Sequence, residues 1–173
     1  MSFGGRGSCV VKPSTRKWDE AIWAAGAAGN RPDWADVMWY GVDRQGRVGM
    51  FTSGGPGPIP RVVFRDLDAY NTLDRHLRGL PAVGKPVLLI RYKPTTDWQR
   101  AAERGLYAFN YEYDRGRPDG YRLVARPSAP LSLTDLPEWA QAQLSEACLR
   151  GESFAEVVDR VADLSGVRCG LVA

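Results

Sequence analysis

Two pairs of short segments combine aromatic, β-branched and polar residues in the pattern of β-hairpins. Residues 37–42 and 47–52 flank a tight turn that ends in Gly46, which can adopt a positive φ. Residues 106–114 and 121–126 flank a second turn of polar and glycine residues. The sequence therefore predicts two antiparallel hairpins in different halves of the chain.

Helical periodicity, in which apolar residues recur three and four positions apart, predicts about five helices. The three middle helices should begin near Asp66, Thr96 and Asp135. In the first helix the expected buried stripe is Trp18, Ala21, Ile22 and Ala25. In the last, which opens on the capping box Ser153-x-x-Glu156, it is Phe154, Val157, Val158 and Val161. This last helix has the clearest sequence pattern of the five.

A single α+β domain follows from these elements. Residues 87–92 form a short continuous apolar run, which is typical of a buried strand. We expect a mainly antiparallel sheet, built from the two hairpins plus this central strand and packed by about five helices. The 173 residues fit one domain, with the glycine-rich residues 1–13 frayed.

Composition and cysteine usage favour a cytoplasmic protein. Hydrophobic residues make up 44% and charged residues 25%, which are ordinary globular values. Cys9, Cys148 and Cys169 are odd in number and widely spaced, so a disulfide framework is not expected and a reducing compartment is the simpler interpretation. The N-terminus lacks the apolar run of a secretory signal, and no apolar stretch is long enough to span a membrane.

The charge is modest but unevenly distributed. A net charge of +3 is too small to indicate a nucleic-acid-binding protein. Residues 61–126 carry 13 Lys and Arg against 8 Asp and Glu, whereas residues 127–173 carry 3 against 7. This polarity could steer a partner, although two solvated faces of opposite sign are the plainer interpretation.

Recognised catalytic and cofactor motifs are missing from the sequence. His76 is the single histidine, and its helical surroundings favour a half-buried or surface residue over a catalytic base. The loop at residues 53–60, Ser-Gly-Gly-Pro-Gly-Pro-Ile-Pro, contains prolines that remove amide donors and lacks the lysine of a phosphate-binding loop. We interpret it as a rigid connector, with a recognition loop as the alternative. We predict no catalytic residue, no metal site and no cofactor.

Aromatic residues supply the most suggestive surface candidates. Tyr107, Phe109, Tyr111 and Tyr113 share one strand face, for which core packing is favoured over contact with a partner, a ligand or nucleic-acid bases. Trp34 and Trp98 lie at element edges, where core packing that closes the sheet is favoured over the alternative of interface residues, since tryptophan is also enriched at binding hot spots.

One segment resembles a known group of proteins. Residues 39–53 read Trp-Tyr-Gly-Val-Asp-Arg-Gln-Gly-Arg-Val-Gly-Met-Phe-Thr-Ser, and Gly57-Pro58-Ile59-Pro60 follows. This segment is similar to the opening hairpin of small uncharacterised bacterial proteins, some of them immunity-like proteins of polymorphic toxin systems. The pattern Tyr121-x-x-Val124-x-x-Pro127-x-x-Pro130-Leu131, with Leu136-Pro137, resembles the same proteins. The resemblance implies a non-enzymatic protein that binds and blocks a cognate toxin, and it supplies no functional residue to transfer.

The leading hypothesis is therefore a cytoplasmic partner-binding protein of bacterial immunity type, with a protein partner and no membrane or nucleic acid. Its candidate contacts, drawn from predicted loops and exposed edges, are Trp34, Gly57, Ile59, Trp98, Arg115 and Arg117. The first alternative is a small-ligand-binding or regulatory domain with a pocket beside Tyr107 and Tyr111. The second is an enzyme of unrecognised type that works through carboxylates, tyrosine or arginine.

Overall fold

The computed structural model describes residues 15–90, 96–113, 119–158, 162–164, 167 and 171–172. The predicted fraying of residues 1–13, and the predicted contacts Arg115 and Arg117, lie outside these residues. The α-helices are α1 (Thr15–Ala27), α2 (Leu67–Gly79), α3 (Thr96–Glu103) and α4 (Glu138–Glu146). Short 3₁₀ helices are η1 (Arg61–Arg65), η2 (Leu133–Asp135) and η3 (Phe154–Glu156).

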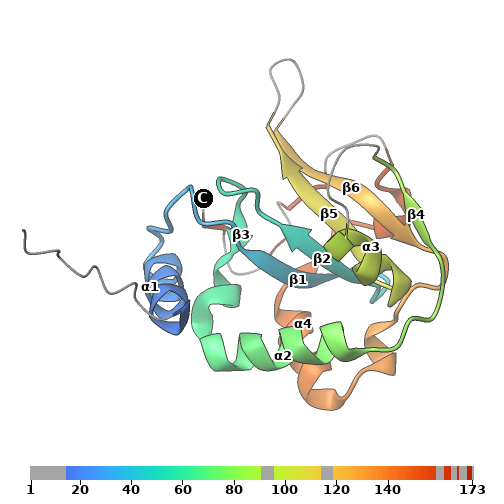
Figure 1. The fold of residues 1–173 in the computed structure, drawn as a ribbon, viewed down its shortest axis with the longest axis horizontal. Coiled ribbons are helices and arrows are strands. Elements are labelled where there is room, and N and C mark those ends of the chain that lie inside the picture. Colours follow the sequence, from blue (N-terminus) through green and yellow to red (C-terminus); the bar gives the residue numbers. More distant parts are fainter. Residues whose placement is uncertain are drawn as a thin grey trace, which may run out of the picture.

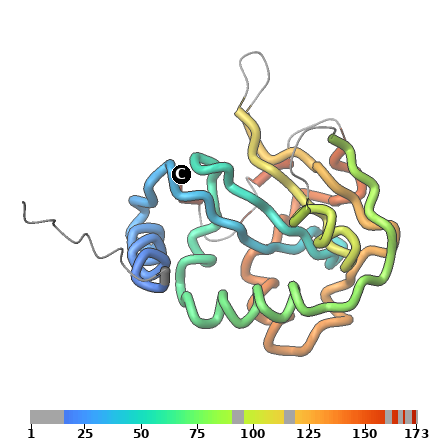
Figure 2. The backbone as a smooth tube through the Cα atoms, in the orientation of Figure 1, coloured from blue at the N-terminus to red at the C-terminus, as the bar shows by residue number. Residues whose placement is uncertain are grey.

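Six strands form one mixed sheet in the order β4-β6-β5-β2-β1-β7 (Figure 1). Their bounds are β1 Met38–Asp43, β2 Val48–Thr52, β4 Pro86–Leu88, β5 Tyr107–Glu112, β6 Gly120–Pro127 and β7 Cys148–Leu149. Both predicted hairpins are confirmed as the antiparallel pairs β1–β2 and β5–β6, and Gly46 turns the first with a φ of 75°. A separate two-stranded sheet pairs β3 (Ile59–Pro60) with β8 (Leu171–Val172), close to α1 (Figure 2).

The prediction of a mainly antiparallel sheet is wrong. The two hairpins join through a parallel pair, β2 with β5, and β7 adds to the other side of β1 in parallel as well. Parallel neighbours need a long crossover, and the chain between β2 and β5 provides one that contains α2 and α3. The run at 87–92 is not central either: β4 forms the edge of the sheet beside β6, and Val87 and Leu88 remain more than 40% exposed.

Four α-helices, and not five, are present in the described part of the chain. The capping box at Ser153 opens only the three-residue η3, and the Ser153 side chain makes no capping hydrogen bond. Phe154 and Val157 are fully buried, Val158 is 44% exposed, and Val161 lies outside the described residues. Within the described part, the apolar residues of this segment therefore pack into the core without forming an α-helical stripe. Tertiary burial has overridden a local helical signal here.

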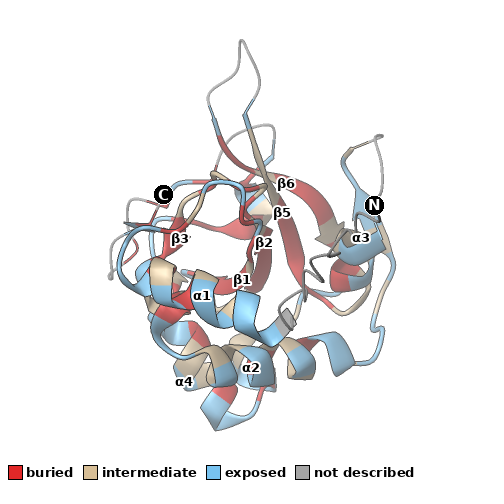
Figure 3. Cartoon of the chain, turned by 60° about the vertical axis from the view of Figure 1, so that its left-hand side comes forward, coloured by how far each residue is buried: buried red, intermediate tan, exposed pale blue. Residues whose placement is uncertain are grey.

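Each face of the sheet has its own hydrophobic core. On one face α2, α3 and α4 pack over Tyr40, Val48 and Met50 (Figure 1). On the other face, Trp39 stacks on Phe51 and Phe51 stacks on Phe109, and the C-terminal segment and α1 complete this core. Helix α1 contributes one side to this core, and much of its remaining surface is exposed (Figure 3).

Candidate functional site

The predicted contacts Gly57 and Ile59 are buried, which corrects their assignment as surface contacts. The guanidinium of Arg31, itself 4% exposed, donates hydrogen bonds to the carbonyl oxygens of Gly55 and, at 2.9 Å, Gly57. A Cβ atom at Gly57 would lie 2.5 Å from the carbonyl oxygen of Ser53. The loop at 53–60 is therefore a tightly packed connector around a buried arginine, as its proline content favours.

Trp98 is only partly available to a partner. Its side chain is half-buried in α3, it packs against the helical core, and its indole nitrogen donates a hydrogen bond to Thr52 Oγ1 at 3.1 Å. This contact ties α3 to the end of β2. Trp98 is thus mainly a packing residue, which is one of the two roles that the sequence left open.

Trp34 is the predicted contact that the structure places on the surface, where its side chain is 66% exposed. Its ring meets that of Trp18 edge to face, with ring centroids 6.2 Å apart and an interplanar angle of 82°. Trp18 is itself 50% exposed. We call these two residues the tryptophan patch. Two large apolar rings held at one place on a surface are typical of a binding surface.

Helix α1 exposes Trp18 because only part of the predicted stripe faces the core: Ile22 packs against it, whereas Trp18 and Ala21 are exposed. Trp23 and Gly26 point inward, and the Trp23 indole nitrogen donates a hydrogen bond to the carbonyl oxygen of Val63 at 3.2 Å. Gly26 lets the helix approach Phe64 so closely that an added Cβ would lie 2.4 Å from its ring. The sequence interpretation missed Trp18 because it assigned that residue to the core; Trp23 and Gly26, three residues apart, were the usable signal.

Hydrogen bonds hold the loop that carries Trp34. Arg31 donates to the carbonyl oxygen of Ala35 at 2.6 Å, and Asp36 accepts hydrogen bonds from Ser53 Oγ at 3.2 Å and from the Gly54 amide at 2.9 Å. Burial lowers the pKa of the Arg31 guanidinium from its usual value. Trp34 consequently stands on a loop that is held in place before binding, which reduces the entropy cost of binding.

The aromatic face around Tyr107 is core, as favoured from the sequence. Tyr107 and Phe109 are 2% and 0% exposed, and the ring of Phe154 packs 5.8 Å and 5.1 Å from theirs. The stripe leaves the core at its end, where Tyr113 is 63% exposed. The ring of Phe154 fills space beside Tyr107, where the ligand-binding alternative placed its pocket.

Three ionisable residues on the helical face, Tyr40, Asp74 and Arg78, are joined by structural hydrogen bonds. The Tyr40 hydroxyl donates to Asp74 Oδ1 at 2.7 Å, and Arg78 Nε donates to the same oxygen at 2.8 Å. Burial, reinforced by Asp74, raises the pKa of Tyr40 far above its usual range. A tyrosine held in this way keeps its proton at neutral pH and is poorly suited to act as a base.

His76 shows no nucleophile or carboxylate partner among the described side chains. Its ring packs edge to face on Trp139 at 5.2 Å, and its Nε2 atom is buried without a hydrogen-bond partner in the described structure. Across the same described residues, no group of three or more His, Cys, Asp or Glu side chains could hold a metal ion. None of the helices described is long and apolar enough to cross a membrane.

No protein-family model matches this chain, and no curated protein or solved structure matches it either.

Proposed function

We propose that this chain is a non-enzymatic binding protein that recognises another protein through the tryptophan patch. The observation that carries the proposal is the edge-to-face pair of Trp18 and Trp34, at 50% and 66% exposure, with the loop of Trp34 braced by Arg31. Tryptophan dominates the binding energy of many interfaces because its large ring desolvates fully against a partner. Exposure of two such rings is costly for a protein that has nothing to bind.

The finer form of the proposal is a bacterial immunity-type protein that acts in the cytoplasm on a cognate toxin. Support comes from the similarity of residues 39–53 to the opening hairpin of immunity-like proteins. The uneven charge, +5 over residues 61–126 and −4 over residues 127–173, suits recognition by complementary potentials. The hydrogen-bonded state of Tyr40, Asp74 and Arg78 adds support for binding over catalysis.

Co-expression with each product of the adjacent genes tests this function. One of those products should arrest growth when expressed alone, and co-expression of the present chain should restore growth. The two purified proteins should then elute together in size-exclusion chromatography. Failure of every adjacent gene product both to arrest growth and to bind would contradict the immunity-type function.

A further inference from the structure

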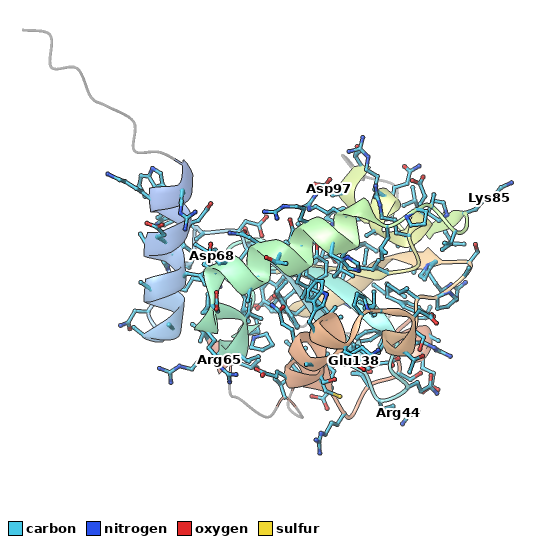
Figure 4. The ribbon with its side chains drawn as sticks, turned by 90° about the horizontal axis from the view of Figure 1, so that it is seen from below. Arg44, Arg65, Asp68, Lys85, Asp97 and Glu138 are labelled. Atoms are coloured by element: carbon cyan, nitrogen blue, oxygen red, sulfur yellow. The ribbon has the colours of Figure 1, made fainter. Side chains whose placement is uncertain are left out.

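A cavity of about 310 Å³ lies between η1, α2 and α4, on the helical face of the sheet. Tyr40 of β1 and Ala147 lie at the sheet side of this cavity, Val62 and Arg65 come from η1, and Ala142 comes from α4. Figure 4 shows Arg65 at the η1 end of α2, with α4 alongside. We refer to this space as the α2–α4 cavity.

The walls of the α2–α4 cavity are largely apolar. Tyr40 and Tyr70 line it, but their hydroxyl groups are already engaged, with Asp74 Oδ1 at 2.7 Å and with the carbonyl oxygen of Met38 at 2.6 Å. These two tyrosines therefore offer ring surface and no free hydroxyl donor. The remaining apolar lining residues are Val62, Val63, Ala69, Leu73, Ala142 and Ala147.

The size of the cavity suits one or two aromatic rings. An enclosed apolar cavity of about 150 Å³ is enough to hold benzene, and small-molecule sites begin at about 300 Å³. The α2–α4 cavity, at about 310 Å³, therefore has room for a bicyclic ring such as indole. Tyrosine faces on its wall can make stacked or edge-to-face contacts with such a ring.

The charged side chains that line the α2–α4 cavity determine which polar group a ligand can carry. Arg65 is paired with Glu146 at 2.6 Å, and both residues line the cavity. Asp66 adds a second carboxylate, which caps α2 by accepting a hydrogen bond from the Ala69 amide at 2.9 Å. These three side chains together carry one more negative than positive charge. A ligand amine would meet carboxylate that Arg65 does not fully neutralise, whereas a ligand carboxylate would be repelled.

We propose that the α2–α4 cavity binds a small aromatic compound of one or two rings that is neutral or carries an amine. This site is separate from the tryptophan patch and goes beyond the proposed recognition of a protein. Its residues come from η1, α2, α4 and the sheet, whereas Trp18 lies in α1 and Trp34 lies in the loop before β1.

Isothermal titration of the full chain with indole, tryptamine and indole-3-acetate tests the site. Indole and tryptamine should bind with a Kd below about 1 mM, and tryptamine should bind at least about tenfold more tightly than indole-3-acetate. Binding should shift the NMR methyl signals of Ala69 and Leu73. An absence of binding by indole and tryptamine up to their solubility limits would overturn the proposal, and so would preferential binding of the acid.

Two variants locate the binding. Ala142→Phe places a ring in the cavity from the exposed side of α4, and it should weaken indole binding by at least about tenfold. Ala24→Phe is the matched control, because Ala24 is exposed on α1 and does not line the cavity. Glu146→Gln should weaken tryptamine more than indole. Unchanged binding by Ala142→Phe, or equal losses for both ligands in Glu146→Gln, would contradict the site.

Discussion

The indole nitrogen of Trp39 donates a hydrogen bond to the hydroxyl of Tyr121, 3.0 Å away, and that hydroxyl donates to the carbonyl oxygen of Pro58 at 3.0 Å. Trp39 and Tyr121 are 0% and 1% exposed. A single hydroxyl thus satisfies a buried donor and an acceptor on elements that are far apart in the sequence. It joins β1, β6 and the connector at 53–60, next to the loop that supports Trp34.

Removal of this hydroxyl should destabilise the fold. Tyr121→Phe leaves the Trp39 indole nitrogen and the Pro58 carbonyl oxygen without their partner, and the expected loss is about 1–3 kcal/mol in the free energy of unfolding. Tyr113→Phe, at a 63% exposed position, is the matched control and should be neutral within about 0.5 kcal/mol. Urea unfolding measures both, and equal effects would contradict the structural role of the Tyr121 hydroxyl.

Asp43 connects the first hairpin turn to the C-terminal segment. Its carboxylate accepts hydrogen bonds from the amides of Gln45 and Arg47, both at 2.9 Å, and from the Phe154 amide at 2.8 Å. Asp43→Asn replaces one acceptor oxygen by an NH₂ group, which is a donor. This NH₂ group then lies opposite a backbone amide that has lost its acceptor. The expected cost is about 1–3 kcal/mol in urea unfolding, whereas Asp119→Asn at an exposed position should cost little. A neutral Asp43→Asn would show that this junction is dispensable.

The hairpins could be predicted from the sequence, but the pairing between them could not. The alternation of apolar and polar residues and the turn at Gly46 are local signals, so the hairpins β1–β2 and β5–β6 could be predicted. The parallel pairing of β2 with β5 depends on how α2 and α3 pack, which no local pattern encodes. The last predicted helix failed for a similar reason: Phe154 packs against the backbone at Gly49, where an added Cβ would lie 2.8 Å from its ring.

Gly26 should be irreplaceable although it lies within a helix. Alanine is the better helix former by about 1 kcal/mol, but its Cβ would lie 2.4 Å from the ring of Phe64. We therefore expect Gly26→Ala to lower the midpoint of thermal unfolding, with a cost of about 1–3 kcal/mol. Gly79→Ala is the control, because its added Cβ would meet no atom within 4 Å outside its chain neighbours and the nearby backbone of its own helix. Stabilisation by both substitutions would contradict the packing of α1 on η1.

Alkaline pH should unfold the protein through its buried tyrosines. Burial raises the pKa of Tyr40, Tyr70 and Tyr121 above the ordinary value for tyrosine. In the unfolded chain these groups ionise near about pH 10, while the native state keeps their protons. Above that pH the native state binds more protons, so the free energy of unfolding falls by up to about 1.4 kcal/mol per pH unit for each tyrosine.

Urea unfolding at a series of pH values above about pH 9 measures this slope, and Tyr70→Phe should make it shallower. Absorbance titration gives an independent check, since Tyr40, Tyr70 and Tyr121 should ionise only as the fold is lost. Ionisation of every tyrosine near about pH 10 in a protein that stays folded would contradict the burial of these hydroxyls.

Only part of the candidate site could be predicted from the sequence. Trp34 was recognisable as a tryptophan at an element edge, but Trp18 was assigned to an apolar stripe of α1 of which Ile22 packs against the core and Trp18 does not. Gly57 and Ile59 look like surface loop residues because proline and glycine surround them. Gly57 packs around Arg31, a charged residue that sequence patterns do not place inside a protein, and Ile59 lies in the hydrophobic core.

Isothermal titration with the partner found among the adjacent gene products tests the central claim most directly. Trp34→Ala and Trp18→Ala should each weaken binding by more than about 2 kcal/mol, which is about thirtyfold in Kd. Trp139→Ala is the matched control, because Trp139 is 44% exposed but lies in α4, away from the tryptophan patch. Retention of full affinity by the double variant Trp18→Ala/Trp34→Ala, or an equal loss in Trp139→Ala, would contradict recognition through the tryptophan patch.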